Sequence, residues 1–128
     1  MTNRDANEPT GSVPASVLVV EDNVLVALDT EETLKRLGVG VVITASNVSQ
    51  ALAAIEQHSP AFVLLDVNLG GETGFAIAEQ LVGLKIPFAF ATGYGEEFAV
   101  PANFAHAPKI GKPYSAETLR AMLELAEF

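Results

Sequence analysis

The sequence contains no cysteine and no tryptophan. It can therefore form no disulfide bond, zinc–thiolate site or thiol nucleophile, and this composition suits a reducing compartment. Aromatic residues make up only 7% of its 128 residues, whereas 49% are hydrophobic. We therefore predict one domain with a mainly aliphatic core.

Basic residues and long apolar runs are also scarce. Seven Lys and Arg against sixteen Asp and Glu give a net charge of −9, which argues against binding to nucleic acid. No run approaches the roughly 18–20 apolar residues of a membrane-spanning helix. The N-terminus also lacks the apolar segment of a signal peptide. We therefore expect a cytoplasmic protein that binds neither nucleic acid nor membranes.

The first fifteen residues are polar, and they contain Pro9, Gly11 and Pro14 but no periodic apolar residues. Such a segment favours disorder. We expect residues 1–15 to form an arm that folding does not require, and residues 16–128 to form the packed domain.

Five short apolar runs predict the strands of a sheet. They are Ser16–Val20, Val41–Ile43, Phe62–Asp66, Pro87–Thr92 and Ala107–Ile110. Helical spacing of apolar residues predicts four helices, namely Val24–Leu37, a helix capped by Asn47, Gly74–Leu84, and a helix capped by Ser115. This alternation is typical of an α/β fold, with a parallel sheet covered by helices on both faces.

Local signals refine these helices. Gly38 lies where a C-terminal cap glycine is expected. The helix after Asn47 is predicted to bury one face, made of Val48, Ala51, Leu52 and Ile55. Residues 95–104 have poor helical propensity because they include Gly95 and Pro101.

The residues that end the strands form a second pattern. They are Glu21 and Asp22 after the first strand, Asp66 at the end of the third, Thr92 at the end of the fourth and Lys112 after the fifth. In an open α/β sheet, ligands bind outside the carboxyl ends of the strands. Because clustered carboxylates repel one another, a hard cation such as Mg²⁺ would stabilise them.

These side chains also suit phosphoryl transfer. An aspartate, here Asp66, can act as a nucleophile and form an aspartyl phosphate. A metal ion then neutralises phosphoryl oxygens, while a hydroxyl and an ammonium contact the others. Thr92 and Lys112 carry those two groups.

On these residues, together with the pair Lys112-Pro113, the chain from Ser16 onward resembles the response-regulator receiver domain of two-component signalling. The order, the spacing and the strand-end placement all agree. The resemblance implies a flavodoxin-like, doubly wound sheet with strand order 2-1-3-4-5. It also implies that a histidine kinase or a histidine phosphotransfer protein phosphorylates Asp66.

The same resemblance implies a magnesium site. Asp22 and Asp66 would bind Mg²⁺ directly, and the backbone carbonyl of Asn68 would be a third ligand. Glu21 would act through a metal-bound water. The peptide bond between Lys112 and Pro113 would be cis.

The stretch PFAFATGYG, Pro87–Gly95, is similar to the FAT GUY subgroup of receivers. The residues Phe90-Ala91-Thr92-Gly93 match its motif outright. Tyr94 and Gly95 follow, so the usual closing tyrosine of the motif is absent.

Ordinary receivers carry an aromatic switch residue three positions before the lysine, but here that position is Lys109. We therefore expect phosphate to order residues 93–106 and to fix Tyr94, with Lys109 placed to pair with Glu96 or Glu97. The residues expected to take part in switching are Thr92, Gly93, Tyr94, Lys109, Pro113 and Tyr114.

Three other functions fit parts of the pattern. A phosphohydrolase of the haloacid-dehalogenase type needs a second acid two residues after the nucleophile, where this chain has Asn68. A flavodoxin-like flavin binder needs a phosphate-binding loop after the first strand, where this chain has Glu21 and Asp22. A pseudo-receiver would keep the fold as a binding module without phosphorylation, yet all five key residues are present.

No output domain is expected beyond the last helix. We therefore expect a monomer or weak dimer that works by docking, as a phosphorylation-controlled binder, a phosphorelay component or a phosphate sink. It would catalyse only its own phosphorylation and slow dephosphorylation, and a downstream regulator protein is a further candidate partner.

Overall fold

The computed structural model describes residues 13–93 and 100–125. Residues 1–12, 94–99 and 126–128 lie outside the described part of the chain. Tyr94, Gly95, Glu96 and Glu97 therefore fall outside it, and with them much of the segment expected to become ordered.

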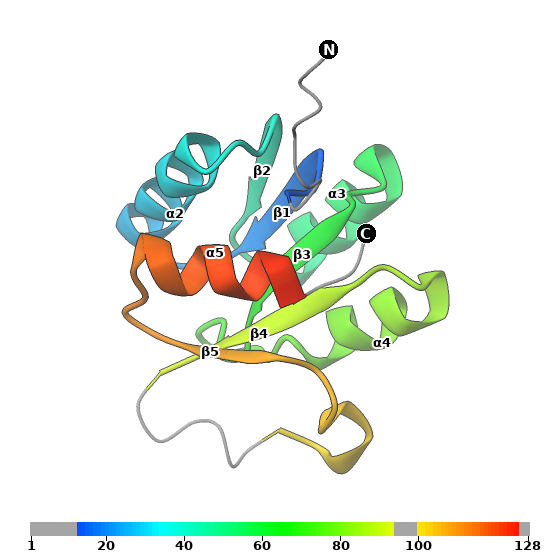
Figure 1. Cartoon of the computed structure of the whole chain (residues 1–128). Coiled ribbons are helices and arrows are strands. Elements are labelled where there is room, and N and C mark those ends of the chain that lie inside the picture. The colour runs from blue at the N-terminus through cyan, green and yellow to red at the C-terminus, as the bar shows by residue number, and fades with distance from the viewer. Residues whose placement is uncertain (1–12, 94–99, 126–128) are drawn as a thin grey trace.

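Five parallel strands form one sheet with the order β2-β1-β3-β4-β5 (Figure 1). Their bounds are β1 Ser16–Val20, β2 Val41–Ala45, β3 Phe62–Asp66, β4 Phe88–Thr92 and β5 Lys109–Gly111. The predicted strand order 2-1-3-4-5 is confirmed.

The fifth strand begins two residues later than the sequence predicts. Pro108, which has no N–H to donate, lies just ahead of it, and its carbonyl accepts a hydrogen bond from the Phe90 amide at 2.9 Å. Regular pairing therefore starts at Lys109, opposite Phe90.

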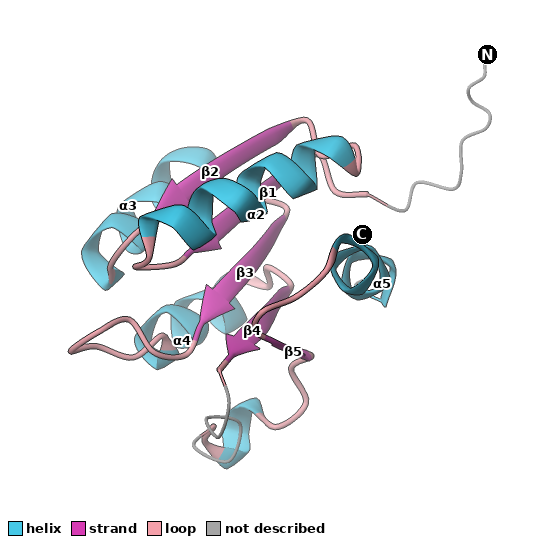
Figure 2. Ribbon diagram, turned by 90° about the vertical axis from the view of Figure 1, so that its left-hand side faces the viewer, coloured by secondary structure: helices cyan, strands magenta, loops and turns pink. Residues whose placement is uncertain are grey.

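In the part of the chain that the structure describes, four α-helices cover the sheet. Their bounds are α2 Val24–Arg36, α3 Val48–His58, α4 Phe75–Leu84 and α5 Ala116–Leu125. Helix α2 lies beside α5 on one face, and α3 lies beside α4 on the other (Figures 1 and 2). In the segment with poor helical propensity, the described residues contain one short 3₁₀ helix, η2 Ala102–Phe104. None of the helices described is long and apolar enough to cross a bilayer.

Side-chain caps set the helix starts. The Asn47 side chain accepts from the Gln50 amide at 2.8 Å, and the Ser115 hydroxyl accepts from the Thr118 amide at 3.1 Å, so both predicted caps are confirmed. At the end of α2, Gly38 has φ of +111°, a conformation that glycine adopts without strain.

Alternate residues of the strands face two separate apolar layers. On the face of α3 and α4, Leu18, Val63 and Leu65 pack with both helices. On the other face, β-strand side chains pack with Leu34 of α2 and Leu119 of α5. Both layers are closed by helices, as the near-continuous apolar strands require.

One predicted core residue is exposed. Leu52 is 36% exposed, whereas Ala51, Ala54 and Ile55 are buried, so the predicted face of α3 was wrong at this position. Successive helical residues point about 100° apart, and the face that meets the sheet is centred on the two alanines and Ile55 rather than on Leu52.

The core is less uniformly aliphatic than predicted. Phe75, Phe88, Phe90 and Phe104 meet on the face of α3 and α4, with ring centroids 5.4 to 6.0 Å apart. Edge-to-face and stacked pairs at such separations are favourable beyond simple burial. These aromatic residues are thus concentrated where η2 joins the sheet.

Residues just before β1 belong to the packed structure. Val13 packs against the apolar layer under α2 and α5, and Pro14 is buried. The carbonyl of Ala15 accepts a hydrogen bond from the Val41 amide at 3.0 Å. These contacts lie inside the segment that the sequence assigned to the arm.

We therefore expect the packed domain to begin at Val13 rather than at Ser16. A truncation that starts at Val13 should melt at the temperature of the full chain. A truncation that starts at Ser16 loses one packed valine and one backbone hydrogen bond, which should lower Tm by about 4–8 °C. Thermal unfolding followed by circular dichroism compares the two, and equal melting temperatures would show that residues 13–15 contribute nothing.

Candidate functional site

The predicted polar residues meet at the carboxyl edge of the sheet. Glu21 and Asp22 follow β1, Asp66 ends β3, and Lys112 follows β5. The Lys112 ammonium donates to Asp66 Oδ2 at 2.8 Å and to Glu21 Oε1 at 3.1 Å. Asp66 is 1% exposed and Glu21 is 3% exposed, so one cation compensates two buried carboxylates.

Three carboxylates at this edge form a candidate metal site. Glu21, Asp22 and Asp66 each place one oxygen so that the three oxygens lie within 4.8 Å of one another. Asp22 is exposed, whereas the other two are buried. A set of carboxylate oxygens that opens to solvent on one side is the donor set that Mg²⁺ prefers.

The loop after β3 holds Asp66 and closes against Asp22. The Asn68 amide donates to Asp66 Oδ1 at 3.1 Å, and the Asn68 Oδ1 accepts from the Gly70 amide at the same distance. Gly70 has φ of +72°, and a Cβ built there would lie 3.4 Å from Asp22 Oδ2. The loop therefore brings the backbone of Asn68 and Gly70 to the acidic cluster.

Gly74 precedes α4 and lies directly against Asp66. A Cβ at this position would come 2.4 Å from the Asp66 carbonyl oxygen, closer than real Cβ atoms approach backbone. The Gly74 amide also donates to the Val67 carbonyl at 3.0 Å. The fit of α4 against the end of β3 thus requires glycine.

Thr92 supplies a hydroxyl side chain at the end of β4 and is 5% exposed. Its carbonyl accepts from the Lys112 amide at 2.8 Å, so the backbone of Lys112 is anchored to β4 beside Thr92. Gly93 follows and is half-buried. The predicted hydroxyl and ammonium groups therefore stand at neighbouring strand ends.

The electrostatic environment shifts two of these groups. Burial raises the pKa of the Asp66 carboxyl from its usual 3.8 to about 6; the hydrogen bond from Lys112 opposes this rise, and the charge of Glu21 adds to it. Burial by itself would lower the pKa of the Lys112 ammonium, but hydrogen bonds and charges from Asp66 and then Glu21 raise that pKa above its usual value. Asp66 thus gains a proton unusually easily, and Lys112 stays charged.

The turn after β5 contains the predicted cis bond between Lys112 and Pro113. Tyr114 is half-buried against the apolar layer of α2 and α5, so it packs as a lid. Its hydroxyl lies 2.8 Å from the Thr30 hydroxyl, which in turn donates to the Val26 carbonyl. Tyr114 therefore fastens this turn to α2.

Lys109 holds the place where ordinary receivers have an aromatic switch residue. Its side chain is exposed, and its ammonium lies 3.3 Å from the carbonyl oxygens of both Ala105 and Ala107. It therefore fixes the loop that leads into β5. Its expected partners Glu96 and Glu97 lie outside the described residues, as does Tyr94.

Sequence reasoning missed two supports of the site. Asn23 caps α2 by accepting from the amides of Leu25 and Val26, while its own amide donates to Glu21 Oε2 at 3.0 Å. Glu72 in the loop after β3 accepts from the Val48 amide at 3.2 Å. The asparagine before α2 could have been identified from its capping preference. Nothing in the sequence marks Glu72.

Comparison with known proteins gives the family. The family model of the response regulator receiver domain matches residues 17–124. The chain belongs to this family. Receiver domains act in two-component signalling, where they typically bind Mg²⁺ at an acidic pocket and interact with kinases or phosphotransfer proteins. Such domains are generally signalling proteins rather than enzymes.

Several relatives are similar over nearly the whole chain. The phyllosphere-induced regulator PhyR of Methylorubrum extorquens is 29% identical over 94% of this chain and 46% of its own length. The solution structure of SdrG from Sphingomonas melonis Fr1 is 33% identical with a TM-score of 0.75, covering 91% of this chain and all of that one. The solution structure of the beryllofluoride-activated conformation of SdrG from Pseudomonas melonis Fr1 is 35% identical with a TM-score of 0.73, covering 89% of this chain and 98% of that one. This chain spans about half the length of the curated relatives that it matches.

The raised pKa of Asp66 predicts a specific pH dependence of stability. Because the pKa in the folded state, about 6, exceeds the usual 3.8, folding favours the protonated carboxyl. The unfolding free energy of the wild type, relative to Asp66→Asn, should therefore fall by roughly 1–3 kcal/mol between about pH 4 and pH 6 and stay level above that.

Urea unfolding of both proteins in EDTA at several pH values measures this difference. Asp29→Asn, which replaces an exposed carboxylate on α2, reports the background and should show no comparable trend. A difference between wild type and Asp66→Asn that is constant from pH 4 to pH 8 would contradict the assignment.

Proposed function

We propose that this receiver domain is a Mg²⁺-dependent phosphoryl acceptor and that Asp66 is the residue that is phosphorylated. The supporting observation is the contact of Asp66 Oδ2 with the Lys112 ammonium, at 2.8 Å, within a cluster of three carboxylates. A structural aspartate at a strand end needs neither of these neighbours. An ammonium and a metal-binding cluster of carboxylates beside Asp66 would compensate the negative charge of a phosphoryl group.

The reaction joins Asp66 to the phosphoryl group of a phosphohistidine. One carboxylate oxygen of Asp66 forms a bond to phosphorus, while the bond from phosphorus to the histidine nitrogen breaks. The nitrogen keeps the electron pair and takes up a proton. Because the pKa of Asp66 is about 6, the carboxylate is mostly ionised at neutral pH and still basic enough to attack.

The residues around Asp66 would divide the remaining work. Asp22 and Asp66, with the Asn68 carbonyl, would hold Mg²⁺, and Glu21 would act through a water ligand. The metal ion would neutralise charge on the phosphoryl oxygens. The Lys112 ammonium and the Thr92 hydroxyl would contact oxygens that the metal leaves free, and Lys112 would exchange its bond to Asp66 for one to phosphate.

The donor would be a histidine kinase or a histidine phosphotransfer protein, and the phosphorylated domain would act by docking. Phosphate would draw in the Thr92 hydroxyl and shift the segment attached to it, with Gly93 as its first residue. The relative SdrG has a beryllofluoride-activated conformation, which supports a phosphorylation-dependent change of this kind. The downstream partner would be a regulator protein.

A phosphohydrolase is the second candidate, and one observation weighs against it. Asn68 stands where such an enzyme needs a general acid, and its side-chain oxygen accepts a hydrogen bond from the Gly70 amide. An amide cannot donate the proton that the leaving group requires. Asp66 would therefore accept a phosphoryl group and lose it only slowly. The domain would not turn over small phosphate esters.

Incubation with acetyl phosphate and Mg²⁺ tests the acceptor directly. The wild type should gain the mass of one phosphoryl group, labile to hydroxylamine, whereas Asp66→Asn should gain none. Asp22→Asn keeps the acceptor but loses a metal ligand, and we expect labelling at least about tenfold slower. Asp29→Asn should match the wild type. Hydroxylamine-labile phosphate on Asp66→Asn, measured by intact-protein mass spectrometry, would refute the assignment.

Metal binding can be tested without phosphorylation. Because Mg²⁺ binds only the folded cluster, saturating Mg²⁺ should raise Tm of the wild type by several degrees. Asp22→Asn should lose most of this rise, whereas Asp29→Asn, with the same change of charge nearby, should keep it. Differential scanning fluorimetry with Mg²⁺ and with EDTA gives both values. An equal rise in all three proteins would mean that Mg²⁺ acts by general screening.

A further inference from the structure

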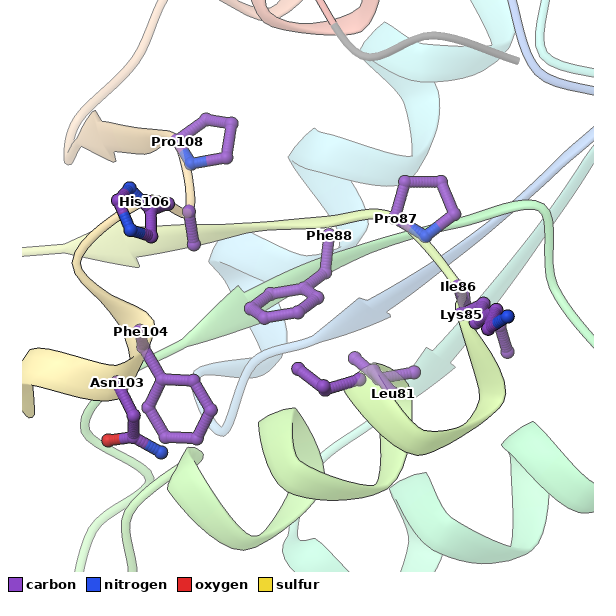
Figure 3. Close-up of a pocket in the computed structure, with 11 residues that line it drawn as sticks. Leu81, Lys85, Ile86, Pro87, Phe88, Asn103, Phe104, His106 and Pro108 are labelled. Carbon is purple, nitrogen blue, oxygen red and sulfur yellow. The ribbon is translucent and has the colours of Figure 1, made fainter.

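A groove lined by none of the acidic-site residues opens between α4 and η2 (Figure 3). Its volume is about 340 Å³. The floor is apolar: Figure 3 shows the ring of Phe88 between Phe104 of η2 and Leu81 of α4. Pro87 and Pro108 add apolar surface at the strand starts. A concave apolar floor of this size can receive one or two large side chains.

The floor is already rigid. The Phe88 ring makes an edge-to-face contact with Phe90 at 5.4 Å, and Phe90 makes a further one with Phe104 at 5.9 Å. Phe75 stacks on Phe104 at 6.0 Å. Because these rings already pack against one another, contact with a ligand would cost little further side-chain entropy in the protein.

Lys85 is the one charged side chain among the described residues that line the groove. Lys85 lies at one end and His106 at the other, and no carboxylate is among the described residues that line it. The ammonium of Lys109, held 3.3 Å from the carbonyls on either side of His106, adds a second positive charge nearby. Two of the seven Lys and Arg residues of a chain with net charge −9 therefore lie at or near this groove.

The backbone conformation of Lys85 is a second feature of this end of the groove. It follows α4 with φ of +60°, in the left-handed region where glycine or asparagine is usual. A lysine there costs about 1 kcal/mol relative to glycine. The backbone nonetheless carries a long cationic side chain at the edge of the groove.

We propose that this groove docks an acidic segment of a partner protein, with a large apolar side chain on Phe88 and flanking carboxylates facing Lys85 and the loop of His106. The proposal rests on the proposed function only in that a receiver domain acts through protein partners. Charge complementarity selects the occupant: an acidic segment gains from the two lysines, whereas a second copy of this acidic chain would meet repulsion from the rest of the surface.

Three capped hexapeptides probe the groove in the absence of Mg²⁺ and phosphate analogues. They are Glu-Glu-Leu-Phe-Glu-Glu, its basic counterpart with four lysines, and Glu-Glu-Ser-Ser-Glu-Glu. Titrations are followed in two-dimensional ¹⁵N–¹H spectra of the full chain. The first peptide should shift amide signals of Lys85, Phe88 and Phe104 in a saturable way, and the other two should bind at least about fivefold more weakly.

The variant Lys85→Glu should weaken binding of the first peptide about two- to fivefold, the range for an exposed ion pair. Lys35→Glu makes the same change of charge on α2 and should leave affinity unchanged. Both variants should accept phosphate from acetyl phosphate at the wild-type rate, so a failure of the groove and a failure of the Asp66 assignment are distinguishable.

Four results would overturn the proposal. They are equal binding of the acidic and basic peptides, equal binding when Leu-Phe is replaced by Ser-Ser, shifts that map outside the groove, and concentration-dependent shifts at the groove without peptide. The last would assign the groove to a second copy of this chain.

Discussion

The Lys112 ammonium between two buried carboxylates is the contact on which the site depends. Burying the carboxylates of Asp66 and Glu21 is costly unless a cation compensates their charge. Removing one partner of such a buried ion pair strongly destabilises the folded protein. The chain secures the lysine through its backbone, because the Lys112 amide bonds the Thr92 carbonyl at the end of β4. The parallel order β1-β3-β4-β5 is what brings residues 91 positions apart into this contact.

Much of this architecture could be predicted because the signals are local. Each buried strand is a short apolar run, and the polar residues that follow these runs lie together at the carboxyl edge of a parallel sheet. The errors arose where local pattern is ambiguous. Leu52 has the hydrophobicity of a core residue but lies beside the buried face of α3, and Val13 follows a polar stretch although it packs against the core.

The acidic cluster could be predicted as a set, but the contacts that hold it could not. The bond between Tyr114 and Thr30 joins residues 84 positions apart, and the bond from Val48 to Glu72 joins the start of α3 to the loop after β3. Such pairs depend on the position and rotation of each helix on the sheet, which the spacing of apolar residues does not determine. Thr30 is buried on α2, and a buried hydroxyl needs a partner, but its position in the sequence does not indicate which residue that partner is.

Gly74 has a consequence for the history of such chains. Its constraint comes from crowding against the Asp66 backbone, so it holds whatever side chain follows Leu65. A relative without the acidic site would have to replace Glu21, Asp66 and Lys112 together, yet the packing of α4 would still retain the glycine eight positions after Asp66. Glycine at this position is therefore a marker of the fold, whereas the acidic residues are a marker of the site. A sequence that keeps the glycine but lacks the acids would have the receiver fold without this acidic site.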